Sequence, residues 1–466
     1  MSDRDDLGRT RVFAAFYLGR LRAHVRELRG RKYPGNHSGP QRWLSLVSGL
    51  LDTAEQYLSN STYPSKDEAE VRTLITDASH LCSNAYHYLE VMSGADVAEL
   101  PYPLVRPLQR WFDELGLVED TFFRTELLEN YELRQFERTT FSGIRDPAPS
   151  LVDAISQTKW PILRVTVPGR AMGIIPHFAI VAHEIGHAMM PRIGLSSVTD
   201  AVRLERANIT TRLAGLGVPT PNRSTFVFLQ KVLLNWVEEF AADAFAGFLT
   251  GPAALFSLSE FLQLARHHGI CDTHPSNELR RGAIFREMAA GAPSFCDVFE
   301  KHTGTKLTAT INSRLIVAAP SEADIAQDML DDGHSPEESA VIAALHGSMV
   351  PIAQATYGSV RDYLKQNKPT LIYTASNYEN DLTNHLLALL AAIPPIENGL
   401  EIGQRTPCDF ATIINVGWVA LLTKMDQLQV RATPADLLGA DKVERLHDLL
   451  LKAVELSEAR REWENA

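Results

Sequence analysis

The chain has 466 residues, of which 45% are apolar and 22% are charged, and its formal net charge is −12. This length allows roughly three domain-sized units and a sizeable core. The acidic balance argues against a general nucleic-acid or anionic-membrane binder, because such proteins carry a basic excess. The four cysteines lie far apart without a C-x-x-C pair, which argues against a disulfide framework and a cysteine-ligated zinc site.

Two features bear on the compartment. The first eleven residues carry charges of both signs and no apolar segment, so we expect no secretory signal. The longest apolar stretches, including 410–423, fall short of the ~18 residues that a membrane span needs. We therefore expect a soluble protein in a reducing, cytoplasmic setting, with no nucleic-acid partner and no membrane span. The oligomeric state stays open.

Residues 1–130 are predicted to form an N-terminal helical region. Apolar residues recur at helical spacing from residue 11 to about 117, as in Leu44, Val47 and Leu51, which predicts four or more helices. Turn-forming residues at 33–36 and 59–65 separate them.

Residues 131–304 are predicted to combine short strands with helices. Strands are expected at 131–138 and 161–170. In the second, the apolar Leu163, Val165 and Val167 alternate with polar residues, which is typical of a half-buried strand. Helical periodicity resumes from residue 176 to about 290.

Residues 305–466 are predicted to form a mostly helical C-terminal region. A short strand is expected at 310–318, and the acidic segment 320–340 is expected to be an exposed connection. Ser335-Pro336-Glu337-Glu338 predicts a capped helix start, and Thr433-Pro434 predicts the start of a last long helix. The fold class expected is mainly α with a small β-sheet (α+β).

The strongest chemical signal is His183-Glu184-Ile185-Gly186-His187, within an apolar run from 174 to 190. On a helix, His183 and His187 lie one turn apart on one face, so both imidazoles can bind one Zn²⁺ ion. Glu184 projects about 100° round the helix, which suits a general base acting on water. The alternative is a metal-free pair of core histidines, whose desolvation must be offset by hydrogen bonds.

A hydrolytic zinc site needs a third protein ligand. Positions 190 and 193 hold Met and Ile, which excludes the metzincin arrangement. Further along the chain, Asn235, Glu239 and Asp243 form one polar stripe on an otherwise apolar helix, and a buried polar stripe needs partners. We predict Glu239 as the third ligand and Asp243 as an acceptor for the ring N–H of a ligand histidine, preferably His183. Glu238 is the fallback ligand.

Together these residues resemble the gluzincin metallopeptidases, particularly the branch with the HtpX-like and CAAX-prenyl-type proteases. Three segments match in order: the histidine motif, E-F-A-A-D at 239–243, and T-H-P-S-N-E-L-R at 273–280. The resemblance covers about 131–290 and implies a zincin-like catalytic core. It also implies that His274 lies near the metal, where it can stabilise an oxyanion. The membrane helices of the better-known relatives are absent.

Several residues keep two interpretations. From the sequence alone, His274 is equally an ordinary residue before a helix start, and Arg280 either braces the site or offers charge to the substrate, with bracing favoured. The resemblance gives the strand 161–170 a second role as an edge strand that binds an extended peptide, beside a plain structural role. His177 is expected to be structural or at a pocket rim.

We therefore expect a zinc-dependent endopeptidase that cleaves protein or peptide substrates. The metal ligands predicted are His183, His187 and Glu239; the catalytic residues are Glu184 and His274; the supporting residues are Asp243, Asn235 and Arg280. Two alternatives remain: a regulatory or interaction protein with a non-hydrolytic metal site, and a regulatory protease that cuts one cellular partner. The intact Glu184 favours an enzyme, because a closed structural site has no use for this carboxylate.

Overall fold

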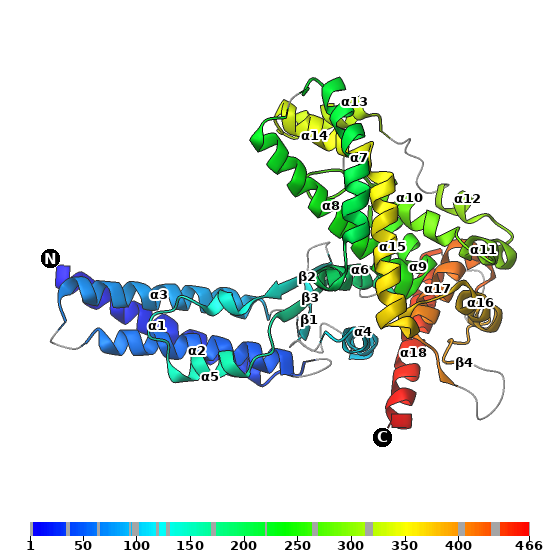
Figure 1. Cartoon of the computed structure of the whole chain (residues 1–466). Coiled ribbons are helices and arrows are strands. Elements are labelled where there is room, and N and C mark those ends of the chain that lie inside the picture. The colour runs from blue at the N-terminus through cyan, green and yellow to red at the C-terminus, as the bar shows by residue number, and fades with distance from the viewer. Residues whose placement is uncertain are drawn as a thin grey trace. The chain divides into compact units, whose positions relative to one another are not determined.

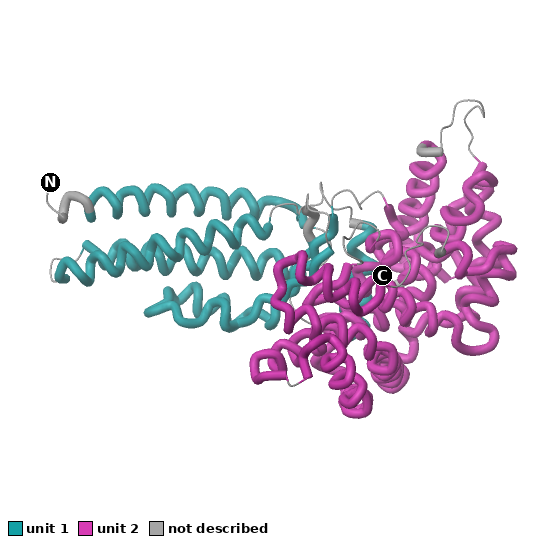
Figure 2. The backbone as a smooth tube through the Cα atoms, turned by 90° about the horizontal axis from the view of Figure 1, so that it is seen from above, with its two compact units in different colours: residues 1–172 teal, residues 173–466 magenta. Residues whose placement is uncertain are grey.

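The computed structural model describes residues 3–33, 38–62, 66–92, 95, 102–117, 121–126, 131–168, 174–219, 221–262, 269–312, 320–398, 406–429 and 439–465. The chain divides into two compact units, residues 1–172 and 173–466 (Figure 2). This division differs from the three expected regions, 1–130, 131–304 and 305–466. The strands expected at 131–138 and 161–170 belong to the unit of the N-terminal helices, and the C-terminal helices belong to the unit of the histidine motif.

Unit 1 combines helices with a three-stranded sheet (Figure 1). Its helices are α1 (Asp3–Arg29), α2 (Ser38–Asn60), α3 (Glu68–Glu90), α4 (Tyr102–Leu115), the 3₁₀ turn η1 (Arg138–Phe141) and α5 (Pro149–Gln157). Helix α2 packs against α1, α3 and α5, and its Trp43, Leu44, Val47 and Leu51 are fully buried in the core. The four helices predicted before residue 117 are confirmed.

The sheet of unit 1 has the order β1-β3-β2. Strand β3 (Ile162–Pro168) pairs in parallel with β1 (Thr121–Glu126), with Leu163 opposite Thr121, and antiparallel with β2 (Glu132–Phe136), with Val165 opposite Leu133. The strands expected at 131–138 and 161–170 are therefore confirmed, whereas β1 was not predicted.

At 161–170 the half-buried strand expected from the alternation and the edge strand implied by the resemblance are both wrong, whereas the other interpretation, a plain structural strand, agrees with the structure. Strand β3 has a neighbour on each side, and all seven of its residues are buried. Arg164 tolerates burial because it forms an ion pair with Glu132 and lies over the ring of Phe136. A central strand has no free backbone edge to offer a peptide, so binding by strand addition to β3 is excluded.

Unit 2 is almost entirely helical (Figure 1). Its elements are η3 (Ile175–Phe178), α6 (Ala179–Met189), η4 (Met190–Arg192), α7 (Ser196–Gly215), α8 (Arg223–Thr250), α9 (Pro252–Leu262), α10 (Asn277–Met288), α11 (Phe295–Thr303), α12 (Leu307–Asn312), α13 (Glu322–Asp331), α14 (Pro336–His346), α15 (Met349–Asn367), η6 (Pro369–Leu371), α16 (Ala375–Leu390), β4 (Glu397–Asn398), β5 (Thr406–Pro407), α17 (Phe410–Thr423), η7 (Met425–Gln427) and α18 (Gly439–Asn465). Strands β4 and β5 pair antiparallel. The chain as described is mainly α with little β structure.

Helix α8 is the centre of unit 2. Asn222 caps its first turn by accepting a hydrogen bond from the Thr225 amide. From Trp236 to Thr250 nearly every residue is buried, and α6, α9, α10, α14 and α15 pack against the helix. A polar side chain in this half of α8 therefore needs a partner inside the protein.

The C-terminal part differs from expectation in two places. Residues 307–312 form helix α12 where a strand was predicted from 310, and residues 313–319 lie outside the described part of the chain. The acidic segment 320–340 is helical instead of an exposed connection: α13 buries Ile325 and Met329, and Ser321 caps it. The capping box at Ser335 and Glu338 is confirmed. Thr433-Pro434 lies outside the described residues.

Among the residues that the structure describes, none of the helices has the length and apolar character needed to cross a bilayer. All four cysteines are free thiols.

Candidate functional site

The histidine motif lies on helix α6, which follows directly after the 3₁₀ turn η3. His183 is buried, whereas Glu184 and His187 are half-buried. Glu239, the predicted third ligand, and Asp243, a predicted supporting residue, lie one turn apart on α8 and are both buried. The site is thus built at the contact between α6 and α8, within unit 2.

Gly186 allows α6 and α8 to approach closely. A Cβ atom at this position would lie 2.5 Å from Cα of Ala242 and 3.1 Å from its carbonyl oxygen. Such distances are shorter than real contacts, and backbone atoms cannot swing aside as a flexible side chain can. The glycine between the two histidines therefore lets the motif reach the carboxylates of α8.

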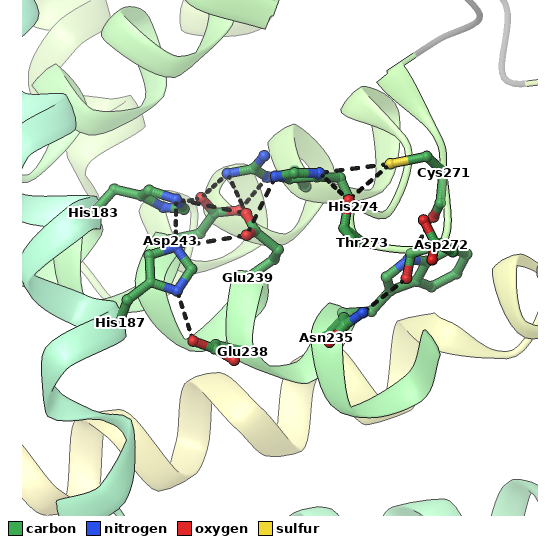
Figure 3. Close-up of polar contacts among 12 residues, drawn as sticks. His183, His187, Asn235, Glu238, Glu239, Asp243, Cys271, Asp272, Thr273 and His274 are labelled. Atoms are coloured by element: carbon green, nitrogen blue, oxygen red, sulfur yellow. Dashed lines mark hydrogen bonds and ion pairs between the residues drawn. The ribbon is translucent and has the colours of Figure 1, made fainter. Parts of the chain in front are cut away.

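The two imidazoles point toward each other and toward Glu239 (Figure 3). Nε2 of His183 lies 3.2 Å from Nε2 of His187, and each of these nitrogens lies 3.5 Å from a different oxygen of the Glu239 carboxylate. Ligand atoms of the three residues all lie within 4.8 Å of one another. Among the residues that the structure describes, His183, His187 and Glu239 form the group of histidine and acidic side chains that could hold a metal ion.

Each imidazole has its other nitrogen against a carboxylate. Nδ1 of His183 lies 2.9 Å from Oδ1 of Asp243, and Nδ1 of His187 lies 3.1 Å from Oε1 of Glu238. A carboxylate at Nδ1 favours the tautomer that carries its proton there. Both Nε2 lone pairs then face the common centre and the Glu239 carboxylate. Without a cation this arrangement is repulsive, so the donor set fits a metal ion.

Arg280, on α10, braces the two buried acidic residues of α8. Its guanidinium donates to both oxygens of Asp243, at 2.9 and 2.8 Å, and lies 3.2 Å from Oε2 of Glu239. Burial alone would raise the pKa of Asp243, but Arg280 and the contact with His183 hold it well below its usual value. Burial would also raise the pKa of Glu239, but the charges of Arg280 and of the nearby histidines together outweigh burial and lower it. Because Arg280 is itself buried, the geometry favours bracing over a contact with substrate.

The charges around the histidines also favour a cation. Arg280 offsets one of the two buried carboxylates, and Glu184 and Glu238 add further negative charge nearby. Burial lowers the pKa of His187, but the hydrogen bond to Glu238 and the charges of Glu239 and Glu184 outweigh it and raise the pKa to about 9. In the metal-free protein a proton on His187 therefore supplies part of the positive charge that offsets the surrounding carboxylates. Metal binding must displace that proton.

His274 approaches the centre from the loop 271–274. Its Nε2 lies 3.5 Å from Oε1 of Glu239, and its Nδ1 lies 2.8 Å from Oγ1 of Thr273. Asn235, predicted to belong to the polar stripe facing the histidines, instead donates to the carbonyl of Asp272 at 3.1 Å (Figure 3). Asn235 therefore supports the loop that carries His274. Of the three residues in the predicted polar stripe, only Glu239 and Asp243 contact the histidines.

His177 and Glu184 occupy different surroundings. Nε2 of His177 lies 2.9 Å from Oε2 of Glu260 on α9, and its ring stacks on Trp418. This fits the predicted structural role. Glu184 is half-buried and near enough to His187 to raise the pKa of that imidazole, yet the metal-binding group contains only the two histidines and Glu239.

Two contacts at the site were not predicted. Glu238, the fallback ligand, lies beside Nδ1 of His187 instead, and Cys271 lies 3.6 Å from Nδ1 of His274. Glu238 precedes Glu239 by one position and projects about 100° away from it round α8. Its role therefore depends on which face of α8 packs against α6. Cys271 stands three residues before His274, and only the fold of the loop brings the two side chains together.

Comparison of the chain with protein-family models, with curated proteins and with solved structures found no match.

Proposed function

We propose that the protein is a zinc-dependent endopeptidase of the gluzincin type, with a zincin-like core in unit 2. One observation carries the proposal: His183, His187 and Glu239 converge within 4.8 Å, while each histidine has a carboxylate at its other nitrogen. Two imidazoles and one carboxylate are the ligands of thermolysin-type zinc sites. The half-buried Glu184, outside this group of three, supplies a candidate general base.

The chain's own residues would divide the work as follows. His183, His187 and Glu239 would hold Zn²⁺, which when bound acidifies water and polarises the scissile carbonyl. Glu184 accepts the proton of the attacking water and returns it to the leaving amine. His274 donates a hydrogen bond from Nε2 to the developing oxyanion.

The supporting residues keep this set in place. Asp243 and Glu238 fix the tautomer of the two histidines, so that both Nε2 atoms are free for the metal. Arg280 holds the carboxylate of Asp243 by charge-assisted hydrogen bonds and that of Glu239 by an ion pair. These groups act before any substrate arrives, which is what a preorganised site requires.

A metal site without hydrolysis is the main rival. Structural zinc sites have four protein ligands, whereas catalytic sites have three and leave a position for water. The group found in the described residues has three members, and this favours the catalytic interpretation. Glu184 favours it too, because it lies near His187 and outside the group of three, where it can act as a general base.

A peptide-library assay tests the proposal. The zinc-loaded wild type is incubated with a diverse peptide library, and products are identified by mass spectrometry beside two variants, Glu184→Gln and Glu260→Gln. We expect cleavage by the wild type and by Glu260→Gln, which changes a glutamate paired with His177 away from the metal. Glu184→Gln should bind zinc and cut nothing. Stoichiometric zinc without any cleavage by the wild type would overturn the endopeptidase proposal.

Substrate range needs a separate comparison. Protein N-termini generated in a cell lysate by the wild type are compared with those generated by Glu184→Gln. A broad endopeptidase yields many unrelated new N-termini. A single cleaved protein would instead support the regulatory protease that acts on one partner.

A further inference from the structure

The loop 271–274, which carries His274, is fastened to α8. Trp236 donates from its indole nitrogen to the carbonyl of Cys271 at 3.0 Å, Asn235 donates to the carbonyl of Asp272, and Lys231 forms an ion pair with the Asp272 carboxylate at 2.9 Å. The loop also closes on itself, because the Cys271 amide donates to the carbonyl of His274 at 3.0 Å. Helix α8 thus holds both Glu239 and the backbone of the loop that faces it.

Within this loop, two side chains contact one nitrogen of His274. Oγ1 of Thr273 lies 2.8 Å and Sγ of Cys271 lies 3.6 Å from Nδ1, and the sulfur and hydroxyl lie 3.1 Å apart (Figure 3). The other nitrogen, Nε2, lies 3.5 Å from Glu239. About half of the His274 side chain is exposed, so packing alone leaves the ring room to turn.

From this geometry we propose that Cys271 is a positioning residue for His274. The thiol, together with Thr273, holds Nδ1 in the loop, so that Nε2 faces the metal centre. Thr273 adjoins His274 in the chain, whereas Cys271 contacts the ring from across the loop. The effect on catalysis rests on the proposed endopeptidase function, but the pairing of thiol and imidazole does not.

The electrostatics of the pair agree with this role. Burial raises the pKa of the Cys271 thiol, but hydrogen bonds with His274 and Thr273 outweigh it and lower the pKa to about 7. A lowered pKa is expected for a thiol whose sulfur is hydrogen-bonded to an imidazole and a hydroxyl. At neutral pH Cys271 should therefore react with electrophiles much faster than an ordinary thiol.

Alkylation tests the pairing without any assay of hydrolysis. The full-length protein is treated with iodoacetamide between pH 5.5 and 9.5, and the rate at the Cys271 peptide is followed by mass spectrometry. We expect half-maximal reactivity near pH 7 in the wild type and a shift toward pH ~8.5, the ordinary thiol value, in His274→Gln. The half-buried Cys296, whose pKa burial raises to about 11, is the internal control. Equal midpoints in the two proteins would overturn the proposal.

Peptide kinetics test the positioning. We expect Cys271→Ala to lower kcat roughly tenfold with little change in KM, because His274 acts on the transition state. Cys271→Ser, which keeps a hydrogen-bonding group, should restore most of the rate. Cys296→Ala should match the wild type, and all variants should hold equal zinc. Wild-type kcat in Cys271→Ala would contradict the proposal. If the wild type cuts no peptide, the endopeptidase function fails while the alkylation result still decides the pairing.

Discussion

Nδ1 of His183 lies 2.9 Å from a carboxylate oxygen of Asp243, deep inside the protein. The Asp243 side chain is only 1% exposed and is itself held by two hydrogen bonds from Arg280. A chain of contacts therefore runs from α10 through α8 to the imidazole on α6. His187 has a similar but more exposed partner in Glu238, whose side chain is 46% exposed.

The pair of His187 and Glu238 gives the first prediction. Because nearly half of the Glu238 side chain is exposed, its substitution should leave the folded structure intact. Glu238→Gln removes the charge that orients His187 and should weaken zinc binding by about 10-fold to 100-fold. Competition with a chromophoric zinc chelator measures the change. The matched control is Glu260→Gln, which alters the comparable pair with His177. Equal zinc affinities in all three proteins would mean that Glu238 does not support the metal site.

Zinc should also stabilise the folded chain. A ligand present at 100 times its Kd adds about 2.7 kcal/mol to the free energy of unfolding, so thermal melting should shift upward with zinc. His187→Ala and Glu239→Gln should lose this shift, whereas Glu184→Gln should keep it, since Glu184 is not a predicted ligand. A zinc-dependent shift that survives in Glu239→Gln would assign the metal to other residues.

The close approach of α6 and α8 makes a third prediction. In Gly186→Ala the added methyl group meets the backbone of Ala242, so the helices must separate. We expect a loss of about 1–3 kcal/mol in the free energy of unfolding and weaker zinc binding, because each helix carries ligands. Gly247→Ala, on α8, is the control: its Cβ would meet only the end of Met288, at 3.5 Å. Denaturant unfolding should show it unchanged or stabilised by up to about 1 kcal/mol.

A fourth prediction concerns Asp381, a buried carboxyl on α16. Burial raises its pKa to about 6, although hydrogen bonds from Tyr373 and Thr412 act in the opposite direction. The folded protein therefore keeps this proton at a pH where the unfolded chain has lost it, and stability falls as pH rises from about 4 to about 6. Asp381→Asn cannot ionise. Its free energy of unfolding should gain about 2 kcal/mol relative to the wild type between pH 4 and pH 7. A difference that does not vary with pH would contradict the shift.

Much of the site could be anticipated because helical spacing fixes which residues share a face. His183 and His187 are one turn apart, as are Glu239 and Asp243, and both pairs do meet in the structure. Spacing within one helix does not reveal how a second helix lies against it. The contact of Glu238 with His187 and the turn of Asn235 toward the loop depend on that packing, so the sequence could not supply them.

The strands show the same limit. Alternating polar residues in 162–168 predicted one exposed face, but Arg164 is buried through its ion pair with Glu132. The strand β1, which completes the sheet, pairs with β3 from some forty residues away in the sequence. The pattern of apolar residues within one segment does not predict which distant segment it pairs with. Thr310, in a segment predicted as a strand, lies in α12, where its hydroxyl bonds to the carbonyl of Lys306.

The central claim is that two histidines and one glutamate bind zinc and leave a position for water. X-ray absorption spectroscopy of the zinc-loaded, full-length protein tests it most directly, after zinc per chain has been counted. We predict one zinc per chain, with two imidazole nitrogens and one carboxylate oxygen at about 2.0–2.2 Å and a further light-atom ligand from water. In the spectrum of Glu239→Gln, the contribution of the carboxylate oxygen should be lost. A sulfur ligand, a third imidazole, or no stoichiometric zinc would contradict the account.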